Sequence, residues 1–213
     1  MQGLTINGMH TFEHYRLKMI SVEIAPPVPI VIKQEVPGRD GALDFSRFFG
    51  EIKYKERKFV AVFDFFEADQ SRAVERLSEI FNDLNGTQAS IINDADPFFH
   101  YDGRLLVEYN DSEKPYYQIK LKADLYPYKL KNSITEVTEN ITGQKNVICN
   151  NLRRPVVPQV VNNAEFTLKF GDNVVTIQPG THTIPDLLLI QGRNVITCIG
   201  TGKISFKYQE GGF

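Results

Sequence analysis

Apolar and polar residues alternate with a period of two in both halves of the chain, and this pattern constrains the fold most. It extends over Tyr117–Leu125, Phe166–Phe170 and Ile204–Tyr208. Because successive side chains of a strand point to opposite faces of a sheet, each segment predicts a half-buried strand. The run Phe59–Phe66 is apolar at almost every position, which is typical of a central strand. The sequence therefore predicts a mainly β fold, β-rich within the α+β class.

One amphipathic helix is predicted over Ser71–Leu84. Asp69 or Ser71 can accept hydrogen bonds from its first backbone amides. Asn85 and Gly86 then supply a left-handed stop. The apolar residues inside the segment recur at spacings of three and four and so form one buried stripe. That stripe consists of Ala73, Leu77, Ile80, Phe81 and Leu84.

A break in composition divides the chain into two parts. Residues 1–130 hold 19 of the 24 Phe and Tyr and 36 of the 50 charged residues. The segment Asn132–Gly143 is rich in Thr, Asn and Glu and almost without apolar residues, so it is interpreted as a linker or boundary. We expect an N-terminal β domain with one helix over residues 1–131 and a C-terminal β-sandwich over 132–213.

Composition excludes several classes of protein. The chain has 213 residues and a formal net charge of −2. This balance argues against a protein that coats nucleic acid or binds an anionic membrane. No apolar run is long enough for a membrane-spanning helix, and the N-terminus has no secretory signal, so we expect a chain kept or assembled in the cytoplasm. Cys149 and Cys198 lack the spacing of a redox or metal motif and are expected to be reduced and half-buried.

Histidines near the N-terminus are one candidate for chemistry. His10 and His14 are four residues apart, a spacing that can bind zinc on a helix. Gly8, Thr11 and Tyr15 disfavour a helix here. On a strand, four residues span about 13 Å, which is too far for one ion. Two surface histidines are therefore expected.

Aspartates supply the other candidate. Asp94, Asp96 and Asp102 could perform acid–base work or hold a metal ion. The segment Asn93–Pro97 is, however, typical of a solvated turn, and this interpretation is favoured. No nucleophile elbow, phosphate-binding loop or dinucleotide-binding motif occurs. The sequence therefore predicts no catalytic, cofactor-binding or metal-ligating residue, with a hydrolase using these aspartates as a weak alternative.

The segment Val36–Asp44 carries the most informative turn signal. A proline fixes φ, the next glycine permits a positive φ, and an Asp-Gly dipeptide of the hairpin type follows. Arg39 could bind an anion, but the flanking Asp40 and Asp44 would more naturally pair with it. The predicted structural turn comprises Pro37, Gly38, Arg39, Asp40 and Gly41.

This turn and its surroundings resemble the distal tail proteins of siphophages, the Dit family. The similar motifs occur in the family's order over nearly the whole chain. Two features depart from the family pattern: the chain has no Trp near the helix start, and its C-terminal part is short. The motifs are Val36–Asp44, Tyr54, Arg57, Leu84–Gly86, Asp94–Pro97, Gly103–Arg104, Pro127–Tyr128, Gly192–Asn194 and Gly200–Tyr208.

The resemblance implies a structural protein of the virion tail without enzymatic activity or cofactor. Members of this family form hexameric rings through their N-terminal domains. The ring joins the tail tube to the tail tip and serves as a hub for a lysin-like tail-tip protein and receptor-binding proteins. The C-terminal domain is galectin-like. The resemblance also implies that DNA passes through the ring without specific binding and that no membrane is involved.

Edge strands and a hairpin of the N-terminal domain are expected to join neighbouring subunits. The segments Arg16–Ile24 and Pro26–Val36 are the candidates. Within them the expected interface residues are Leu17, Met19, Val28, Ile30, Ile32 and Glu35.

A carbohydrate-binding β-sandwich is the alternative function. Sugar binding commonly uses exposed aromatic side chains. The C-terminal part has few aromatics, and most fall at strand positions expected to be buried, which disfavours this alternative. These aromatics are Phe166, Phe170, Phe206, Tyr208 and Phe213.

Overall fold

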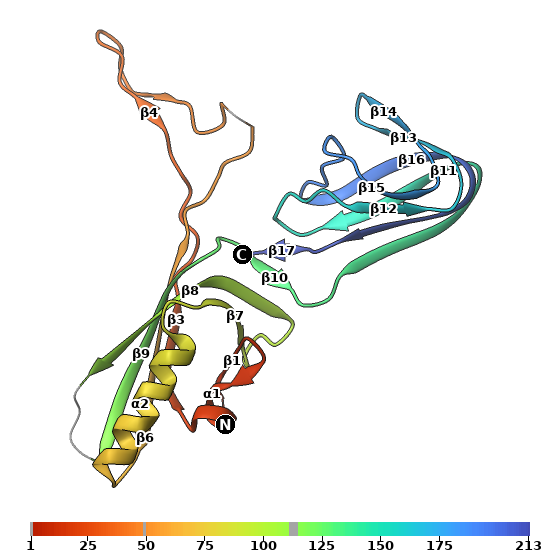
Figure 1. The fold of residues 1–213 in the computed structure, drawn as a ribbon. Coiled ribbons are helices and arrows are strands. Elements are labelled where there is room, and N and C mark those ends of the chain that lie inside the picture. Colours follow the sequence, from red (N-terminus) through yellow and green to blue (C-terminus); the bar gives the residue numbers. More distant parts are fainter. Residues whose placement is uncertain (1, 49, 111–114) are drawn as a thin grey trace. The chain divides into compact units, whose positions relative to one another are not determined.

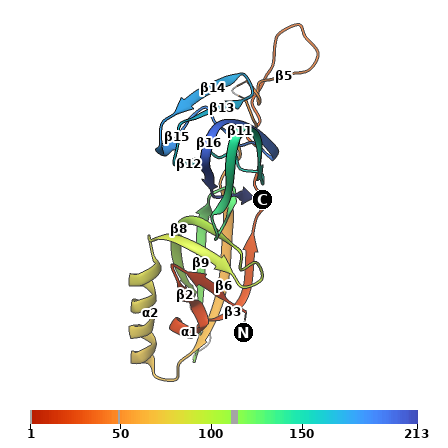
Figure 2. The ribbon, with the colours of Figure 1, turned by 90° about the vertical axis from the view of Figure 1, so that its right-hand side faces the viewer.

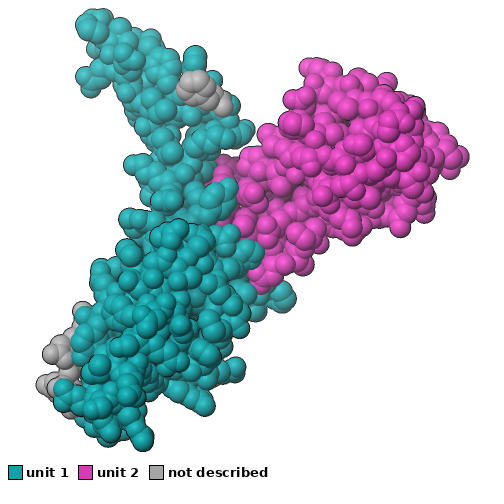
Figure 3. Space-filling view, viewed as in Figure 1, with its two compact units in different colours: residues 1–127 teal, residues 128–213 magenta. Residues whose placement is uncertain are grey.

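The computed structural model describes residues 2–48, 50–110 and 115–213 and divides into two compact units. Unit 1 covers Met1–Pro127 and unit 2 covers Tyr128–Phe213 (Figure 3). Both units are built mainly from antiparallel strands, as the sequence predicted. None of the described helices is long and apolar enough to cross a membrane.

Unit 1 contains one extended antiparallel sheet with the strand order β2-β1-β7-β8-β9-β6-β3. The strands β6 and β9 pair over their whole length, from Arg57 opposite Leu125 to Phe66 opposite Tyr116. Both strands lie inside the sheet, flanked by β8 and β3 (Figure 2). The sheet strands are β1 (Leu4–Ile6), β2 (Met9–His10), β3 (Lys18–Ile24), β6 (Arg57–Phe66), β7 (Gln88–Asn93), β8 (Phe99–Asn110) and β9 (Tyr116–Leu125).

The predicted long helix is α2 (Gln70–Leu84), and it lies beside the sheet (Figure 2). Asp69 caps it by accepting hydrogen bonds from the amides of Ser71 and Arg72. Gly86 follows the helix with a φ of 76°, so the helix ends as the sequence predicted. The apolar stripe of α2 packs on the core of the sheet.

The core of unit 1 is formed by the buried face of each central strand. In β6 every second side chain, from Phe59 to Phe65, is at most 3% exposed. The other face of β6 is partly exposed, so this strand is half-buried rather than buried on both faces. The central strand thus alternates in burial even though its sequence is almost wholly apolar.

A second helix, α1 (Thr11–Tyr15), corrects the prediction for the first histidines. The sequence disfavoured a helix here, yet His10 caps one, and Thr11 and Tyr15 are its buried residues. Arg16 ends the helix in the left-handed region, at a φ of 53°. Burial of two side chains in the core outweighed the weak helix propensity of the segment, as tertiary packing often does.

Unit 2 is built around one long pair of antiparallel strands. Its strands β11 (Thr135–Asn151) and β16 (Gly192–Tyr208) pair over seventeen residues each and curve together (Figure 1). Gly143 lies opposite Gly200 within this strand pair and has a φ of 80°. A glycine at such an angle lets a strand bend where other residues would be strained.

Four further strands of unit 2 extend the sheet from the other edge of β16, in the order β14-β13-β16-β12-β15, whereas β10 and β17 pair with each other. Side chains from β11, β12, β13, β14 and β16 and from residues 184–189 enclose one apolar core, which includes Phe166, Phe206 and Cys198 at 0% exposure. The shorter strands are β10 (Lys129–Lys131), β12 (Gln159–Asn162), β13 (Phe166–Phe170), β14 (Asn173–Ile177), β15 (Gly180–Thr183) and β17 (Gly211–Gly212).

The segment Asn132–Gly143 is not the linker that its composition suggested. Most of it belongs to β11, whose Val137 and Ile141 face the core of unit 2. The polar residues of this segment form the solvent-facing side of the paired strand β11. The contact boundary between the units lies at Pro127, four residues before the expected one.

Candidate functional site: an exposed arm

The segment between β3 and β6 leaves the sheet of unit 1 and forms an arm, defined here as residues 25–48 and 50–56. It projects as a narrow pair of chain segments (Figure 1). Its stalk is held by backbone bonds such as Ile30 N to Lys53 O at 2.8 Å and Lys55 N to Val28 O at 2.8 Å. None of the described arm residues is buried. The arm therefore has no hydrophobic core of its own.

Near its end the arm forms a small hairpin from β4 (Lys33–Gln34) and β5 (Leu43–Asp44). The hydroxyl of Ser46 accepts a hydrogen bond from the Ile32 amide at 2.9 Å and so continues the pairing below it. A two-stranded hairpin is at best marginally stable in water. Packing against another protein surface would therefore stabilise the arm.

The tip of the arm contains the turn identified in the sequence. The amide of Arg39 donates to the carbonyl of Val36 at 3.2 Å, which closes a four-residue turn. Pro37 occupies its second position and Gly38, with a φ of 80°, its third, as a type II turn requires. Gly41 also has a positive φ, of 76°. Whether this turn is needed for stability or assembly stays a prediction.

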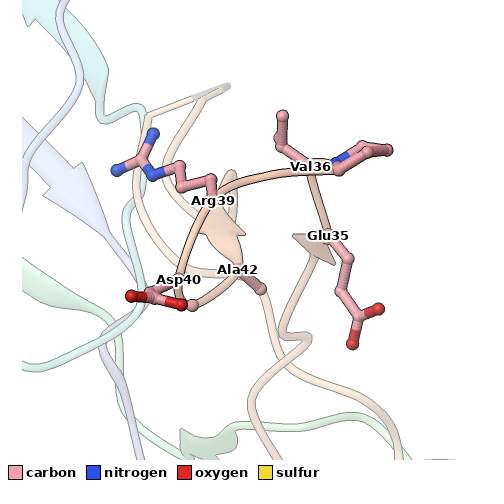
Figure 4. A pocket seen from close by; sticks show the side chains of 7 residues that line it. Glu35, Val36, Arg39, Asp40 and Ala42 are labelled. Atoms are coloured by element: carbon pink, nitrogen blue, oxygen red, sulfur yellow. The ribbon is translucent and has the colours of Figure 1, made fainter.

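Charged groups at the tip are arranged differently from the expected ion pairs. The side chains of Arg39 and Glu35 point away from each other across a hollow of the turn (Figure 4). Asp44 accepts a hydrogen bond from the Ser46 amide at 2.8 Å, and its hydrogen bonds with Ser46 lower the pKa of this carboxyl. Arg39 takes part in none of the ion pairs among the described residues. The expected pairing of Arg39 with Asp40 or Asp44 is therefore wrong, because Asp44 instead stabilises the turn of its own strand.

Exposed apolar side chains concentrate on the arm. Phe48 is 71% exposed and its ring meets that of Phe45 edge-on, with 6.1 Å between the ring centroids. These two rings, Ile32 and Gln34 line a shallow groove of about 340 Å³. Contiguous apolar surface of this kind marks interaction sites. The other exposed apolar residues of the arm are Val28, Ile30, Val31 and Val36.

The predicted interface residues fall into two groups. Val28, Ile30, Ile32 and Glu35 all lie exposed on the arm, where another chain can reach them. Leu17 is 0% exposed in the core of unit 1, so it is not available to a neighbour and its assignment is corrected.

Met19 lies at the start of β3, partly buried against the same core. The strand β3 ends the sheet order, so its outer edge is not paired within the described sheet. Its exposed Ile20 and a bulge between Met19 and Ser21 are features the sequence did not signal. An edge strand can accept a strand from another molecule.

The aspartates considered for catalysis have structural partners instead. Asp94 accepts a hydrogen bond from the Gly3 amide at 2.7 Å and faces Nε2 of His10 at 3.2 Å. Asp102 lies 3.8 Å from His100. No set of three metal-ligating groups among the described residues includes any of the three aspartates.

The aromatic residues of unit 2 provide little exposed ring surface on which a sugar could stack. Phe166, Phe206 and Tyr208 are at most 3% exposed, as their strand positions predicted. Phe213 is 41% exposed, but its ring already stacks on Tyr128 at 5.2 Å between centroids. A groove of about 280 Å³ on this unit is lined by residues none of which is aromatic: Glu136, Val161, Asn162, Asn163, Lys203, Ser205 and Lys207.

Comparison with known proteins supports the fold. No protein-family model matches the chain, and no curated protein matches it. Among solved structures, the crystal structure of the Dit protein of phage SPP1 matches with a TM-score of 0.71. The match covers 98% of this chain and 99% of that one, at 14% sequence identity. This chain therefore has the Dit fold over nearly its whole length.

The resemblance seen in the sequence thus agrees with the structure. The SPP1 Dit protein is described as a paradigm of the hub adsorption apparatus in phages that infect Gram-positive hosts.

Proposed function

We propose that this chain is a structural protein of a phage or prophage tail that forms a hexameric ring at the distal end of the tail. The match to the SPP1 Dit protein over 98% of this chain carries this proposal, because that protein is described as a paradigm of a hub adsorption apparatus.

The exposed arm supports the ring. A ring needs one surface of each subunit to bind a different surface of the next, in contacts that close by rotation. The arm offers such a surface in Val28, Ile30 and Ile32, which have no partner core in their own chain. The edge strand β3, which leads directly into the arm, offers a second.

Charge is compatible with the same assembly. Six copies with a net charge of −2 each would carry about −12, which is weak repulsion for a particle of about 146 kDa. A chain without a basic surplus would also let DNA slide through the ring rather than bind to its wall. We therefore expect weak or no affinity for DNA at physiological salt.

As a hub in the virion tail, assembled in the host cytoplasm, the ring would bind a tail-tube protein on one side. A lysin-like tail-tip protein and receptor-binding proteins would bind elsewhere. Unit 2, a galectin-like sandwich in this proposal, would carry outward contacts, and no membrane or cofactor is needed.

The test is the oligomeric state of the purified chain. Light scattering across concentration and negatively stained images should reveal a six-fold ring, alone or after addition of a tail-tube partner. Ile32→Asp should abolish ring formation, because a charge would enter the apolar contact. Ile190→Asp is the matched control, since Ile190 is exposed to a similar degree on unit 2 (53% against 48%).

A strictly monomeric chain at every concentration, which also fails to form rings with a tail-tube partner, would refute the proposal. Equal ring formation by both variants would leave the ring intact but remove the arm from its interface.

A further inference from the structure

Three side chains of the types that bind metal ions meet on the surface of unit 1. His14 comes from the last turn of α1, and Glu79 and Asp83 lie one turn apart on α2. One ligand atom from each lies within 4.8 Å of the other two, and all three side chains are exposed. Among the described residues, no other set of three such groups gathers this closely. The sequence separates His14 from its partners by more than sixty residues, so spacing could not reveal the cluster.

Further contacts join the two helices that supply these side chains and orient two of the side chains. Nη2 of Arg76 on α2 donates to the carbonyl oxygen of Tyr15 on α1 at 2.5 Å. The Tyr15 hydroxyl donates to Oδ2 of Asp83 at 3.2 Å. The ring of His14 meets that of Tyr15 edge-on, with 4.5 Å between centroids. These contacts orient His14 and Asp83 before any ion is bound, as supporting groups do in metal sites, and Glu79 lies one turn before Asp83 on the same helix.

The local electrostatics favour a cation. Glu79 and Asp83 are like charges at positions i and i+4 of a helix, which repel each other. A cation between the two carboxylates would remove their repulsion.

We propose that His14, Glu79 and Asp83 bind one divalent transition-metal ion, with zinc as the representative. One imidazole and two carboxylates suit zinc better than calcium or magnesium, which take oxygen ligands. Zinc lies about 2.0–2.2 Å from such ligand atoms, so the three atoms would draw together to about 3–4 Å from one another. Rotation of exposed side chains supplies that movement. The ion would clamp α1, near the start of the chain, onto α2.

His10 is not part of this site. Its Nδ1 accepts from the Glu13 amide as the helix cap, and its Nε2 faces Asp94. The site therefore differs from the His10–His14 pair that the sequence raised and disfavoured.

Calorimetric titration of zinc chloride into the full chain, prepared without a histidine tag, tests the site. We expect one zinc ion per chain. His14→Ala and Asp83→Asn should each weaken zinc binding at least tenfold. His182→Gln should leave it unchanged, because His182 lies on unit 2 and its Nε2 contacts the Gln178 carbonyl. Tyr15→Phe should weaken binding by about tenfold through loss of support for Asp83.

Thermal melting gives a second measurement that separates a lost site from a misfolded variant. Zinc should raise the melting temperature of the parent chain and of His182→Gln, but not that of His14→Ala, since a ligand stabilises only the state that binds it. Magnesium at the same concentration should have no such effect. Zinc binding that is absent from the parent chain, or that is equally strong in His14→Ala and Asp83→Asn, would overturn the proposal.

Discussion

The carboxylate of Asp94 accepts a hydrogen bond from the backbone amide of Gly3 at 2.7 Å, across 91 residues of sequence. The same oxygen lies 3.2 Å from Nε2 of His10. Asp94 therefore ties the first strand and the cap of α1 to the turn after β7. Gly3 must be small here, because a Cβ at this position would lie 2.7 Å from the His10 ring.

Asp94→Ala should lower the free energy of unfolding by about 1–2 kcal/mol, because it leaves the Gly3 amide without its acceptor. Denaturant unfolding followed by fluorescence or circular dichroism measures this. Asp40→Ala is the control and should be near neutral, since Asp40 is exposed at the tip of the arm. Equal stability of both variants would show that the Gly3–Asp94 bond is energetically unimportant.

The two cysteines should not react in the folded protein. Burial raises the pKa of the Cys149 and Cys198 thiols to about 12, so at pH 8 only about one in ten thousand is thiolate. Iodoacetamide at pH 8 should label neither in the native chain and both in guanidinium chloride. Thr201→Cys, at an exposed position, should label readily. Rapid native labelling of the parent chain would contradict the buried placement.

The same shifts predict a loss of stability at alkaline pH. An unfolded thiol titrates near pH 9 and the folded thiols near 12, so unfolding releases protons above about pH 9. Each thiol therefore adds its full contribution to the free energy of unfolding below pH 9, and this contribution decreases as the pH rises above 9. Unfolding titrations at pH 7, 9 and 10.5 should show this decrease, and it should be smaller in the double variant Cys149→Ala, Cys198→Ala. An identical decrease in both chains would assign the effect to other groups.

Gly103→Ala should destabilise unit 1 strongly. A Cβ on Gly103 in β8 would lie 2.7 Å from both the Asp124 carbonyl oxygen and the Leu125 side chain of β9. Overpacking of this kind costs about 1–3 kcal/mol. Gly212→Ala is the matched control, since its Cβ would meet only Leu152 at an ordinary 3.8 Å. If the two variants had the same melting temperature, β8 and β9 would be able to move apart to fit the added methyl group without loss of stability.

The sequence was sufficient to predict the elements whose local signals and burial agree. The stripe and caps of α2 led to the right helix, and the alternation at Phe166–Phe170 led to the right strand. The sequence did not predict the elements whose structure is determined by tertiary contacts. The segment Thr11–Tyr15 is helical because Thr11 and Tyr15 are buried in unit 1. No local sequence pattern indicates this burial.

The arm was partly predictable. Its turn at Gly38 follows from local chemistry, and the exposure of Val28 and Ile32 agrees with the prolines at positions 26, 27 and 29 beside them. The burial of Leu17 could not, because an apolar residue just before an edge strand can face either the core or a neighbour. The metal-ligating cluster was invisible because its members come from two helices far apart in sequence.

The arm should be the first part of the free chain to be cut by trypsin. Proteases cleave exposed backbone that can unfold locally. None of the described arm residues is buried. The arm offers Lys33, Arg39 and Arg47 as cleavage sites. Lys145 on β11 is the internal comparison, because it is also exposed but lies in a strand paired along its full length. Mass spectrometry of early fragments should therefore find cuts in the arm and none at Lys145. If the chain forms a ring through the arm, assembled particles should resist the same cuts, whereas Ile32→Asp should remain sensitive. Early cleavage at Lys145 would instead show that the paired strands β11 and β16 of unit 2 separate more easily than the strands of the arm.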